Sequence, residues 1–190
     1  MTRLVREHSV PALVLGDDGW VVGVRQIISP NQDARPDACP PSLIVIHAIS
    51  LPPDDFGGPG VEQLFTNTLD VDVHPYFAEI SHLRVSAHFF IRRDGELIQF
   101  VSTRARAWHA GVSAWKGRSR CNDFSIGIEL EGCDTRPFEA AQYAQLTSLL
   151  RCLKRTFLIE DIVAHSTIAP GRKTDPGPFF EWRYVDQAMR

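Results

Sequence analysis

The segment from His165 to Pro178 carries the side chains best suited to chemistry in this sequence. Its first eleven residues include His165, Arg172, Lys173 and Asp175. Imidazole and carboxylate groups are ordinary zinc ligands, at about 2.0–2.2 Å from the metal. The three prolines and two glycines of the segment favour a loop with a fixed backbone over a helix interior or a central strand. Taken alone, such a loop is more often a surface segment whose charges are solvated. A metal site would need support from residues elsewhere in the chain.

Two apolar stretches each contain one polar residue that a buried strand does not need. In residues 43–47 this residue is His47, and in residues 125–130 it is Glu129. His165 also ends a short apolar run, and two strand-end histidines can lie side by side in one sheet. Asp175 would then complete a set of three ligands and leave a fourth position to water, as in catalytic zinc sites.

The other polar residues of these stretches suggest roles around such an ion. Zinc would lower the pKa of a bound water to about 7 and polarise a scissile carbonyl. Glu129 is the candidate base for the water proton, although Glu131 on the same strand face also fits an exposed sheet surface. Lys173 could stabilise an oxyanion, a role in which one donor is worth about 3–4 kcal/mol, or it could be a solvated loop lysine.

Several alternatives stay open on pattern alone. When His47 or His165 is considered alone, burial in the core explains it better than metal binding does. Trp108 and Trp115 could stack on a sugar or peptide, although tryptophan is more often buried packing. Other histidines could be ligands, and three arginines could hold carboxylates bidentately. These residues are His74, His82, His88 and His109, and Arg84, Arg120 and Arg172.

The elements that would position these residues follow from hydrophobic periodicity. The apolar runs predict buried strands, and Tyr143, Leu146, Leu150, Leu153 and Phe157 form one stripe of a long helix. The favoured Asp-Gly pair at 94–95 predicts a hairpin turn. Residues 105–117 and the polar segment 29–41 are expected to be loops. Residues 20–28 are expected to form a strand or an edge segment. Further strands are expected at 42–49, 84–91, 96–101, 124–131 and 161–165, and helices at 61–69, 75–81 and 139–157.

These elements imply an α/β fold of the α+β type, in which helices flank a central mixed β-sheet. We expect one domain over residues 20–190, preceded by an irregular lead-in over residues 1–19. The formal charge of −3 argues against a general nucleic-acid binder. No run is long enough for a membrane helix, and the start has no export-signal pattern. Four cysteines without CxxC spacing suggest free thiols, so we expect a cytoplasmic protein.

Five longer motifs carry a resemblance to a known family. They lie at 49–53, 82–88, 106–113, 121–132 and 168–177, and read ISLPP, HLRVSAH, RAWHAGVS, CNDFSIGIELEG and IAPGRKTDPG. With them the chain resembles the zinc-dependent N-acetylmuramoyl-L-alanine amidase superfamily from about Trp20 to Trp182. It is most similar to the branch of 1,6-anhydro-N-acetylmuramyl-L-alanine amidases, cytoplasmic enzymes of peptidoglycan recycling.

The resemblance implies a function and a set of site residues. The expected activity is hydrolysis of the amide between the lactyl group of an anhydro-muramyl sugar and L-alanine, with an associated part in β-lactamase regulation. The zinc ligands would be His47, His165 and Asp175, and the catalytic pair Glu129 and Lys173. The partner would be an anhydro-muropeptide, with no nucleic acid or membrane, and the protein is expected to be a monomer. The substrate groove would include Arg84, Trp108, His109, Arg120 and Arg172.

The chain departs from the family pattern near two of the ligands. Ala48 stands where the family has an asparagine able to hydrogen-bond the muropeptide. Around the second histidine, Ala164, Ser166 and Thr167 replace the usual Gly, Cys and Asp. These changes concern substrate affinity and loop detail, while every implied ligand is present.

Two other functions remain to be separated from this one. The first is a muropeptide-binding module without catalysis, of the kind found among peptidoglycan recognition proteins that lack part of the ligand set. The second is a lysin that cuts intact cell wall. The complete ligand set favours an enzyme over the binding module, and the expected lack of an export signal disfavours an autolysin.

Overall fold

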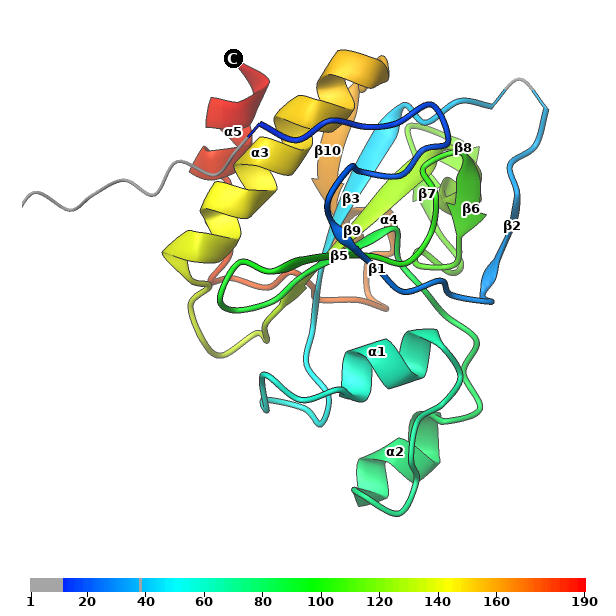
Figure 1. The fold of residues 1–190 in the computed structure, drawn as a ribbon, viewed down its shortest axis with the longest axis vertical. Helices are drawn as coiled ribbons and strands as arrows, with labels where there is room; N and C mark the ends of the chain where they lie inside the picture. Colours follow the sequence, from blue (N-terminus) through cyan, green and yellow to red (C-terminus); the bar gives the residue numbers. More distant parts are fainter. Residues whose placement is uncertain (1–11, 38) are drawn as a thin grey trace, which may run out of the picture.

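The computed structural model describes residues 12–37 and 39–190, so most of the predicted lead-in, residues 1–11, lies outside it. In the described part the main sheet has the strand order β1-β5-β4-β9-β3-β10 (Figure 1). The pair β4–β5 is antiparallel, and the other neighbours are parallel. The strands are β1 (Arg25–Gln26), β5 (Leu97–Gln99), β4 (Phe89–Ile91), β9 (Ser125–Glu131), β3 (Leu43–Ile49) and β10 (Asp161–Ala164).

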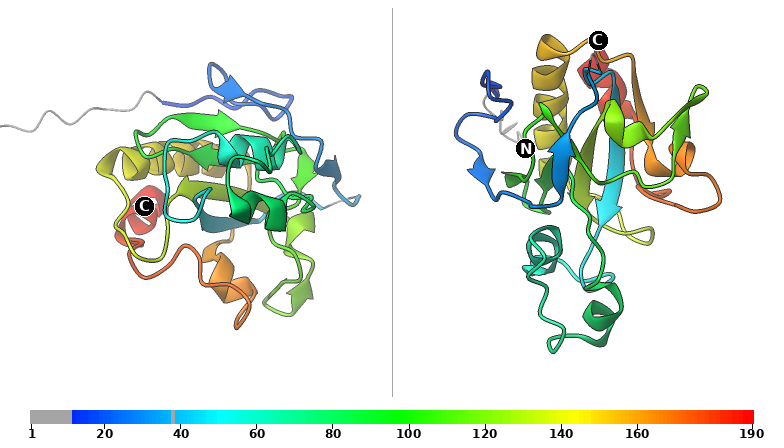
Figure 2. Two further views of the ribbon diagram at one scale, coloured as in Figure 1. Left: turned by 90° about the horizontal axis from the view of Figure 1, so that it is seen from below. Right: turned by 90° about the vertical axis from the view of Figure 1, so that its right-hand side faces the viewer.

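Helices and two small antiparallel ribbons surround this sheet. The ribbons pair β2 (Gln32–Ala34) with β6 (Ala105–Ala107), and β7 (Ala114–Trp115) with β8 (Arg118–Ser119). Figure 2 shows α1 and α2 together at one end of the molecule, away from α3 and α5. The helices are α1 (Gly60–Phe65), α2 (Pro75–Ile80), η1 (Cys121–Asp123, 3₁₀), α3 (Ala140–Thr156), α4 (His165–Ile168) and α5 (Arg183–Met189). Among the described residues, no helix is both long and apolar enough to cross a membrane.

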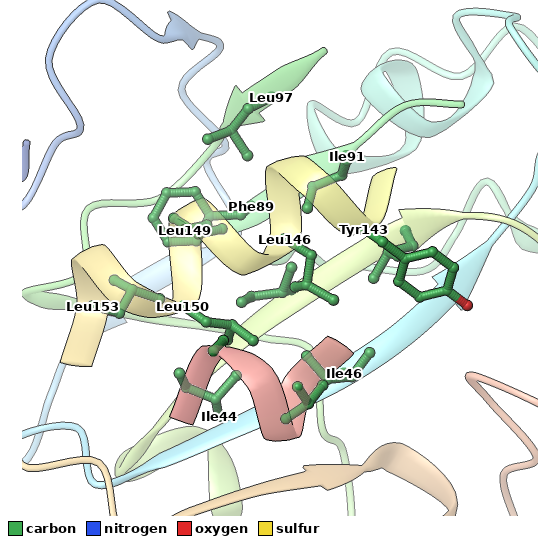
Figure 3. Close-up of a cluster of buried hydrophobic side chains, with 14 of the residues drawn as sticks. Ile44, Ile46, Phe89, Ile91, Leu97, Tyr143, Leu146, Leu149, Leu150 and Leu153 are labelled. Atoms are coloured by element: carbon green, nitrogen blue, oxygen red, sulfur yellow. The ribbon is translucent and has the colours of Figure 1, made fainter. Parts of the chain in front are cut away.

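The long helix α3 covers one face of the sheet. Its predicted apolar stripe is buried from Tyr143 to Leu153, and Phe157 caps the helix end. Gln142 at its start is fully buried and donates hydrogen bonds to the carbonyls of Ile91 and Glu131, which ties the helix to β4 and β9. Figure 3 shows the leucines of α3 packed against sheet residues Ile44, Ile46, Phe89, Ile91 and Leu97.

The opposite face of the sheet carries the polar residues singled out in the sequence. Since side chains alternate along a strand, Ile126, Ile128 and Leu130 face α3, and Gly127 and Glu129 face away from it. A second apolar cluster on this opposite side joins Phe90 and Ile98 to α1 and α2, and includes Leu64, Phe65 and Phe77. The sheet therefore separates a packed helical layer from a layer in which polar side chains gather.

Four local expectations were wrong. The predicted strand 84–91 pairs in the main sheet only at Phe89–Ile91, because the Ser86 amide donates to the Trp108 carbonyl instead. The expected loops 29–41 and 105–117 contain β2, β6 and β7. The segment after β10 starts with the helical turn α4, because its first proline and glycine come only at Pro170 and Gly171. By contrast, the edge segment expected within 20–28 is confirmed, since Arg25–Gln26 forms β1 at one edge of the main sheet.

We expect Leu146→Ala to lower the free energy of unfolding by about 2–5 kcal/mol, because Leu146 is fully buried between α3 and the sheet. The matched control is Leu158→Ala, since Leu158 is 92% exposed. That control should change the free energy of unfolding by less than about 0.5 kcal/mol. Chemical denaturation of the two variants measures the difference. Equal effects would contradict the burial of the α3 stripe against the sheet.

Candidate functional site

The register of the parallel strands brings the chemical residues together. In the β3–β9 pair, His47 lies directly opposite Glu129. In the β3–β10 pair, Ala164 lies opposite Ile46, so His165 is the next residue after the paired segment and comes beside His47. Paired residues of neighbouring parallel strands point to the same face, and here that face is opposite α3. Three elements distant in sequence thus deliver three polar side chains to one place.

Asp175 closes this group from the loop after α4. The Nδ1 atoms of His47 and His165 are 3.0 Å apart, and Asp175 Oδ2 lies 3.1 Å from the former and 3.0 Å from the latter. The amide of Ser166 donates to the Asp175 carbonyl at 3.0 Å, which holds the loop against the helical turn. Among the described residues, these three form the one group of His, Cys, Asp and Glu side chains arranged to hold a metal ion.

The donor set of this triangle fits a divalent cation. His165 Nε2 lies 3.2 Å from the Ala110 carbonyl, which can only accept a hydrogen bond. His165 therefore carries its proton on Nε2 and leaves a lone pair on Nδ1, facing Asp175. A tetrahedral ion with bonds of about 2.0–2.1 Å separates its ligand atoms by roughly 3.3 Å, close to the three distances observed. Two imidazole nitrogens and one carboxylate oxygen are an ordinary zinc donor set.

The protonation of the triangle also suits metal binding, since ligands must be deprotonated. Burial lowers the pKa of His47 from 6.5 to about 4, outweighing the opposing hydrogen bond with Asp175. Burial alone would raise the pKa of Asp175, but the hydrogen bonds with His165 and His47 lower it below its usual 3.8. Near neutral pH the site therefore presents a neutral imidazole and a carboxylate.

Glu129 lies beside the triangle as a buried carboxyl group. Its Oε1 is 4.0 Å from His47 Nδ1, and its Oε2 is buried without a hydrogen-bond partner. Burial raises the pKa of Glu129 well above 4.5, Asp175 raises it further, and Lys173 lowers it. An unpaired buried polar atom is costly, and such groups concentrate at functional sites.

These residues open into a cleft of about 590 Å³. One side is polar and carries the triangle with Glu129, Lys173 and Thr174. The other side is apolar and comes from the α1–α2 region and the chain that follows it. Its lining residues include Leu64, Phe65, Tyr76, Ile80, Leu83 and Val85. Ala48, at the position where the family pattern has asparagine, also lines the cleft.

The structure divides the predicted groove residues into two groups. Trp108, His109 and Arg172 line the cleft. Arg84 is exposed and donates to the carbonyls of Ser81 and Leu83, and its side chain is not among the residues that line the cleft. Arg120 is 70% exposed and pairs with Asp123 at 3.1 Å, also away from the lining.

The other candidate histidines occupy separate places. His88 is fully buried, where its Nδ1 accepts from the Gly127 amide and its Nε2 lies 3.2 Å from the Ala105 carbonyl. His74 caps α2 by accepting from the Tyr76 amide. His82 is exposed. None of the three joins the triangle.

The sequence did not predict that Glu131 and Arg35 hold the site in place. Glu131, considered above as a sign of an exposed sheet face, is 3% exposed and accepts from the amides of Gly57 and Arg93. It thereby anchors the loop that follows β3. Arg35 reaches from the predicted polar loop to the carbonyls of Asp123 and Ser125, and burial lowers its pKa to about 10. Both side chains bond to backbone groups of other segments, and such hydrogen bonds produce no periodic pattern in a sequence from which they could be predicted.

Comparison with known proteins gives three findings. Residues 37–178 match the sequence profile of the N-acetylmuramoyl-L-alanine amidase family. The chain is 57% identical over 171 residues to the 1,6-anhydro-N-acetylmuramyl-L-alanine amidase AmpD of Salmonella typhimurium, covering 89% of this chain and 91% of that protein. A crystal structure of a selenomethionine AmpD derivative matches with a TM-score of 0.89 and 54% identity, over 92% of this chain and 99% of the other.

A more distant structure contains a ligand. It is a complex of the Escherichia coli N-acetylmuramyl-L-alanine amidase AmiD with the substrate anhydro-N-acetylmuramic acid-L-Ala-D-gamma-Glu-L-Lys. It matches with a TM-score of 0.58 and 29% identity, over 94% of this chain and 66% of that one. The fold and these matches define an amidase of the α/β class. The chain belongs to the N-acetylmuramoyl-L-alanine amidase family. The predicted family, fold class and enzyme class are thereby confirmed.

We expect the metal-free protein to lose stability as the pH falls from about 6.5 toward about 4. Burial lowers the pKa of His47 to about 4 and the pKa values of His88 and His109 well below 6.5. The unfolded chain then binds more protons than the folded chain, which costs up to about 1.4 kcal/mol per pH unit for each histidine. Glu129 opposes this trend, because its raised pKa adds stability at low pH that is lost as the pH rises.

Thermal unfolding in the presence of a chelator measures this balance. Three histidines outweigh one glutamate, so the melting temperature should be lower near pH 5 than near pH 7. A melting temperature that stays constant or rises toward pH 5 would contradict the neutral, buried state of these histidines.

Proposed function

We propose that this protein is a zinc-dependent amidase that cuts the amide between the lactyl group of 1,6-anhydro-N-acetylmuramic acid and L-alanine. The observation that carries the proposal is the triangle of His47, His165 and Asp175 atoms, 3.0–3.1 Å from one another beside the buried Glu129. A zinc ion held by these three residues would polarise the scissile carbonyl and lower the pKa of a bound water to about 7.

Glu129 is the proposed general base and acid. A base works best when its pKa lies near the working pH, and burial shifts the pKa of Glu129 in that direction. Its carboxylate takes the proton of the attacking water and passes it to the leaving amine of L-alanine. Its unpaired Oε2 leaves one oxygen free for this exchange.

Lys173 and the cleft walls complete the proposed site. Lys173 lines the cleft near Glu129 and Asp175, and its ammonium group stabilises the negative charge that develops on the carbonyl oxygen. The apolar wall with Tyr76 and Trp108 offers surface for a sugar ring. Arg172 also lines the cleft, where its Nη2 donates to the carbonyls of Ala110 and Val112, and we propose that the rest of its guanidinium group meets a carboxylate of the peptide.

The substrate assignment rests on the relatives. AmpD of Salmonella typhimurium is named as a 1,6-anhydro-N-acetylmuramyl-L-alanine amidase, and the AmiD structure is a complex with an anhydro-muramyl peptide substrate. We infer the same substrate class here, in peptidoglycan recycling, with an indirect effect on β-lactamase regulation. We further infer a monomer that works in the cytoplasm on soluble muropeptides and binds neither nucleic acid nor membrane. The net charge of −3 is in keeping with this.

Removal of zinc should abolish hydrolysis of soluble anhydro-muropeptide, because the proposed chemistry needs the ion to activate the water. The measurement is product release by chromatography after exhaustive chelation and after zinc is added back. A parallel assay on whole sacculi should show little release, which separates this function from that of a lysin. Undiminished turnover in the zinc-free protein would refute the mechanism, and binding without product would favour the non-catalytic module.

Glu129→Gln should lower kcat by roughly 100- to 10,000-fold while zinc content stays at the wild-type level, since the side chain moves a proton and is not a proposed ligand. The control is Glu160→Gln, because Glu160 is exposed and its side chain lies outside the cleft lining. Kinetics and metal analysis of both variants give the answer. A Glu129→Gln protein with wild-type kcat would remove Glu129 from the mechanism.

A further inference from the structure

His109 contacts one of the proposed metal ligands on the side away from the ion. Its Nδ1 lies 2.9 Å from His47 Nε2, and its Nε2 lies 3.1 Å from Ser125 Oγ. The rings of His47 and His109 meet edge to face, with centroids 5.0 Å apart. His109 is 9% exposed, so most of its surface packs inside the protein and only its edge reaches the cleft.

The strand β9 leaves room for this contact at one position. Gly127 lies on the same face as Ser125 and Glu129, between them. A Cβ atom at Gly127 would come within 2.4 Å of His109 Cγ and 2.7 Å of His109 Nδ1. The absence of a side chain here therefore lets the imidazole cross β9 and reach His47. A glycine inside a strand often marks such a close approach.

The segment His109–Ala110 serves both histidines of the triangle. The Ala110 carbonyl lies 3.2 Å from His165 Nε2, while the neighbouring His109 ring lies against His47 Nε2. Asn122 holds the segment, since its Oδ1 accepts from the amides of both His109 and Ala110. The segment His109–Ala110 thus contacts Nε2 of both His47 and His165, the nitrogen of each ring that points away from the proposed ion.

The hydrogen-bond pattern decides which nitrogen of His47 carries the proton. If His47 donates its Nε2 proton to His109 Nδ1, its own Nδ1 keeps a lone pair directed at Asp175 and His165. His109 then carries its proton on Nε2 and donates it to Ser125 Oγ. The reverse arrangement puts a proton on His47 Nδ1, at the point where an ion would bind. Partners of this kind fix the tautomer and orientation of ligand histidines in metal sites.

We propose that His109 is a positioning residue that fixes the tautomer and ring orientation of His47 for metal binding, with Gly127 supplying its space and Ser125 its second partner. This role rests on the zinc site of the proposed function. It differs from the role of a groove residue that binds substrate, because its effect falls first on metal affinity.

The test is the zinc affinity of His109 variants, measured by competition with a chromophoric chelator. His109→Phe keeps a ring but removes the acceptor, and should weaken zinc binding by roughly 10- to 100-fold. His109→Asn places an amide oxygen near the original Nδ1, and should retain affinity within a few-fold of wild type. Ser125→Ala should show a smaller loss than His109→Phe. Circular dichroism of each metal-free variant reports whether it folds.

Gly127→Ala provides a second test that leaves His109 itself unchanged. The added methyl displaces the imidazole and should weaken zinc binding, although Gly127 is not itself a proposed ligand. The control is Gly58→Ala, where a Cβ would meet nothing nearer than 3.8 Å. If His109→Phe does not fold, the comparison of zinc affinity between Gly127→Ala and Gly58→Ala still tests the proposal.

The outcomes separate the two proposals. Wild-type zinc affinity in His109→Phe and Gly127→Ala, with a raised KM for muropeptide, would make His109 a substrate contact and overturn this inference alone. A wild-type protein that binds no zinc would overturn the proposed function, and the role of His109 with it. Weakened zinc binding in both variants, restored in His109→Asn, supports the positioning role.

Discussion

The parallel register of β3 with β9 and β10 is the constraint on which the site depends. His47 lies opposite Glu129 in one pair, and the end of the other pair delivers His165 to the same place. A shift of either strand by one residue would turn its polar side chain toward α3 and into the apolar core. The packing of α3 on Ile44, Ile46, Ile126 and Ile128 therefore also selects the register that assembles the site.

The buried polar side chains on the other face of the sheet are held by hydrogen bonds. His88, His109 and Ser125 are buried, and each has a hydrogen-bond partner. Unpaired, such groups would each cost a few kcal/mol. The exception beside the triangle is Glu129, whose Oε2 has no partner. Trp108 Nε1 is also buried without a partner, so these two unpaired atoms belong to residues that line the cleft, where the chemistry is proposed.

Hydrogen bonds to backbone groups of neighbouring segments hold the loops around the cleft. Glu131 binds the amides of Gly57 and Arg93, so the loop after β3 is tied to the hairpin turn before β5. Ser166 binds the Asp175 carbonyl, which closes the segment that carries Lys173. These anchors give the cleft defined walls although its lining comes from many parts of the chain.

Much of this arrangement could be predicted from the sequence, for identifiable reasons. The apolar runs around His47 and Glu129 indicated buried strands, and the stripe from Tyr143 to Leu153 indicated the face of α3. Types of residue alone suggested that His47, His165 and Asp175 could share an ion, and the register places them together. The sequence does not show which partner a buried polar group chooses. Pattern alone therefore left Glu131 as a possible sign of an exposed face. The family resemblance placed Arg84 and Arg120 in the groove, and neither showed the contact of His109 with His47.

The most direct test of the central claim is X-ray absorption spectroscopy at the zinc edge of the purified protein. We predict a first shell of nitrogen and oxygen atoms only, at about 2.0–2.1 Å, from two imidazoles, one carboxylate and water. After unbound zinc is removed, the Asp175→Asn variant should retain little of the zinc that gives this signal. A sulfur shell at about 2.3 Å, which would point to the cysteines, or a spectrum unchanged in Asp175→Asn, would contradict the convergence of these three residues on one ion.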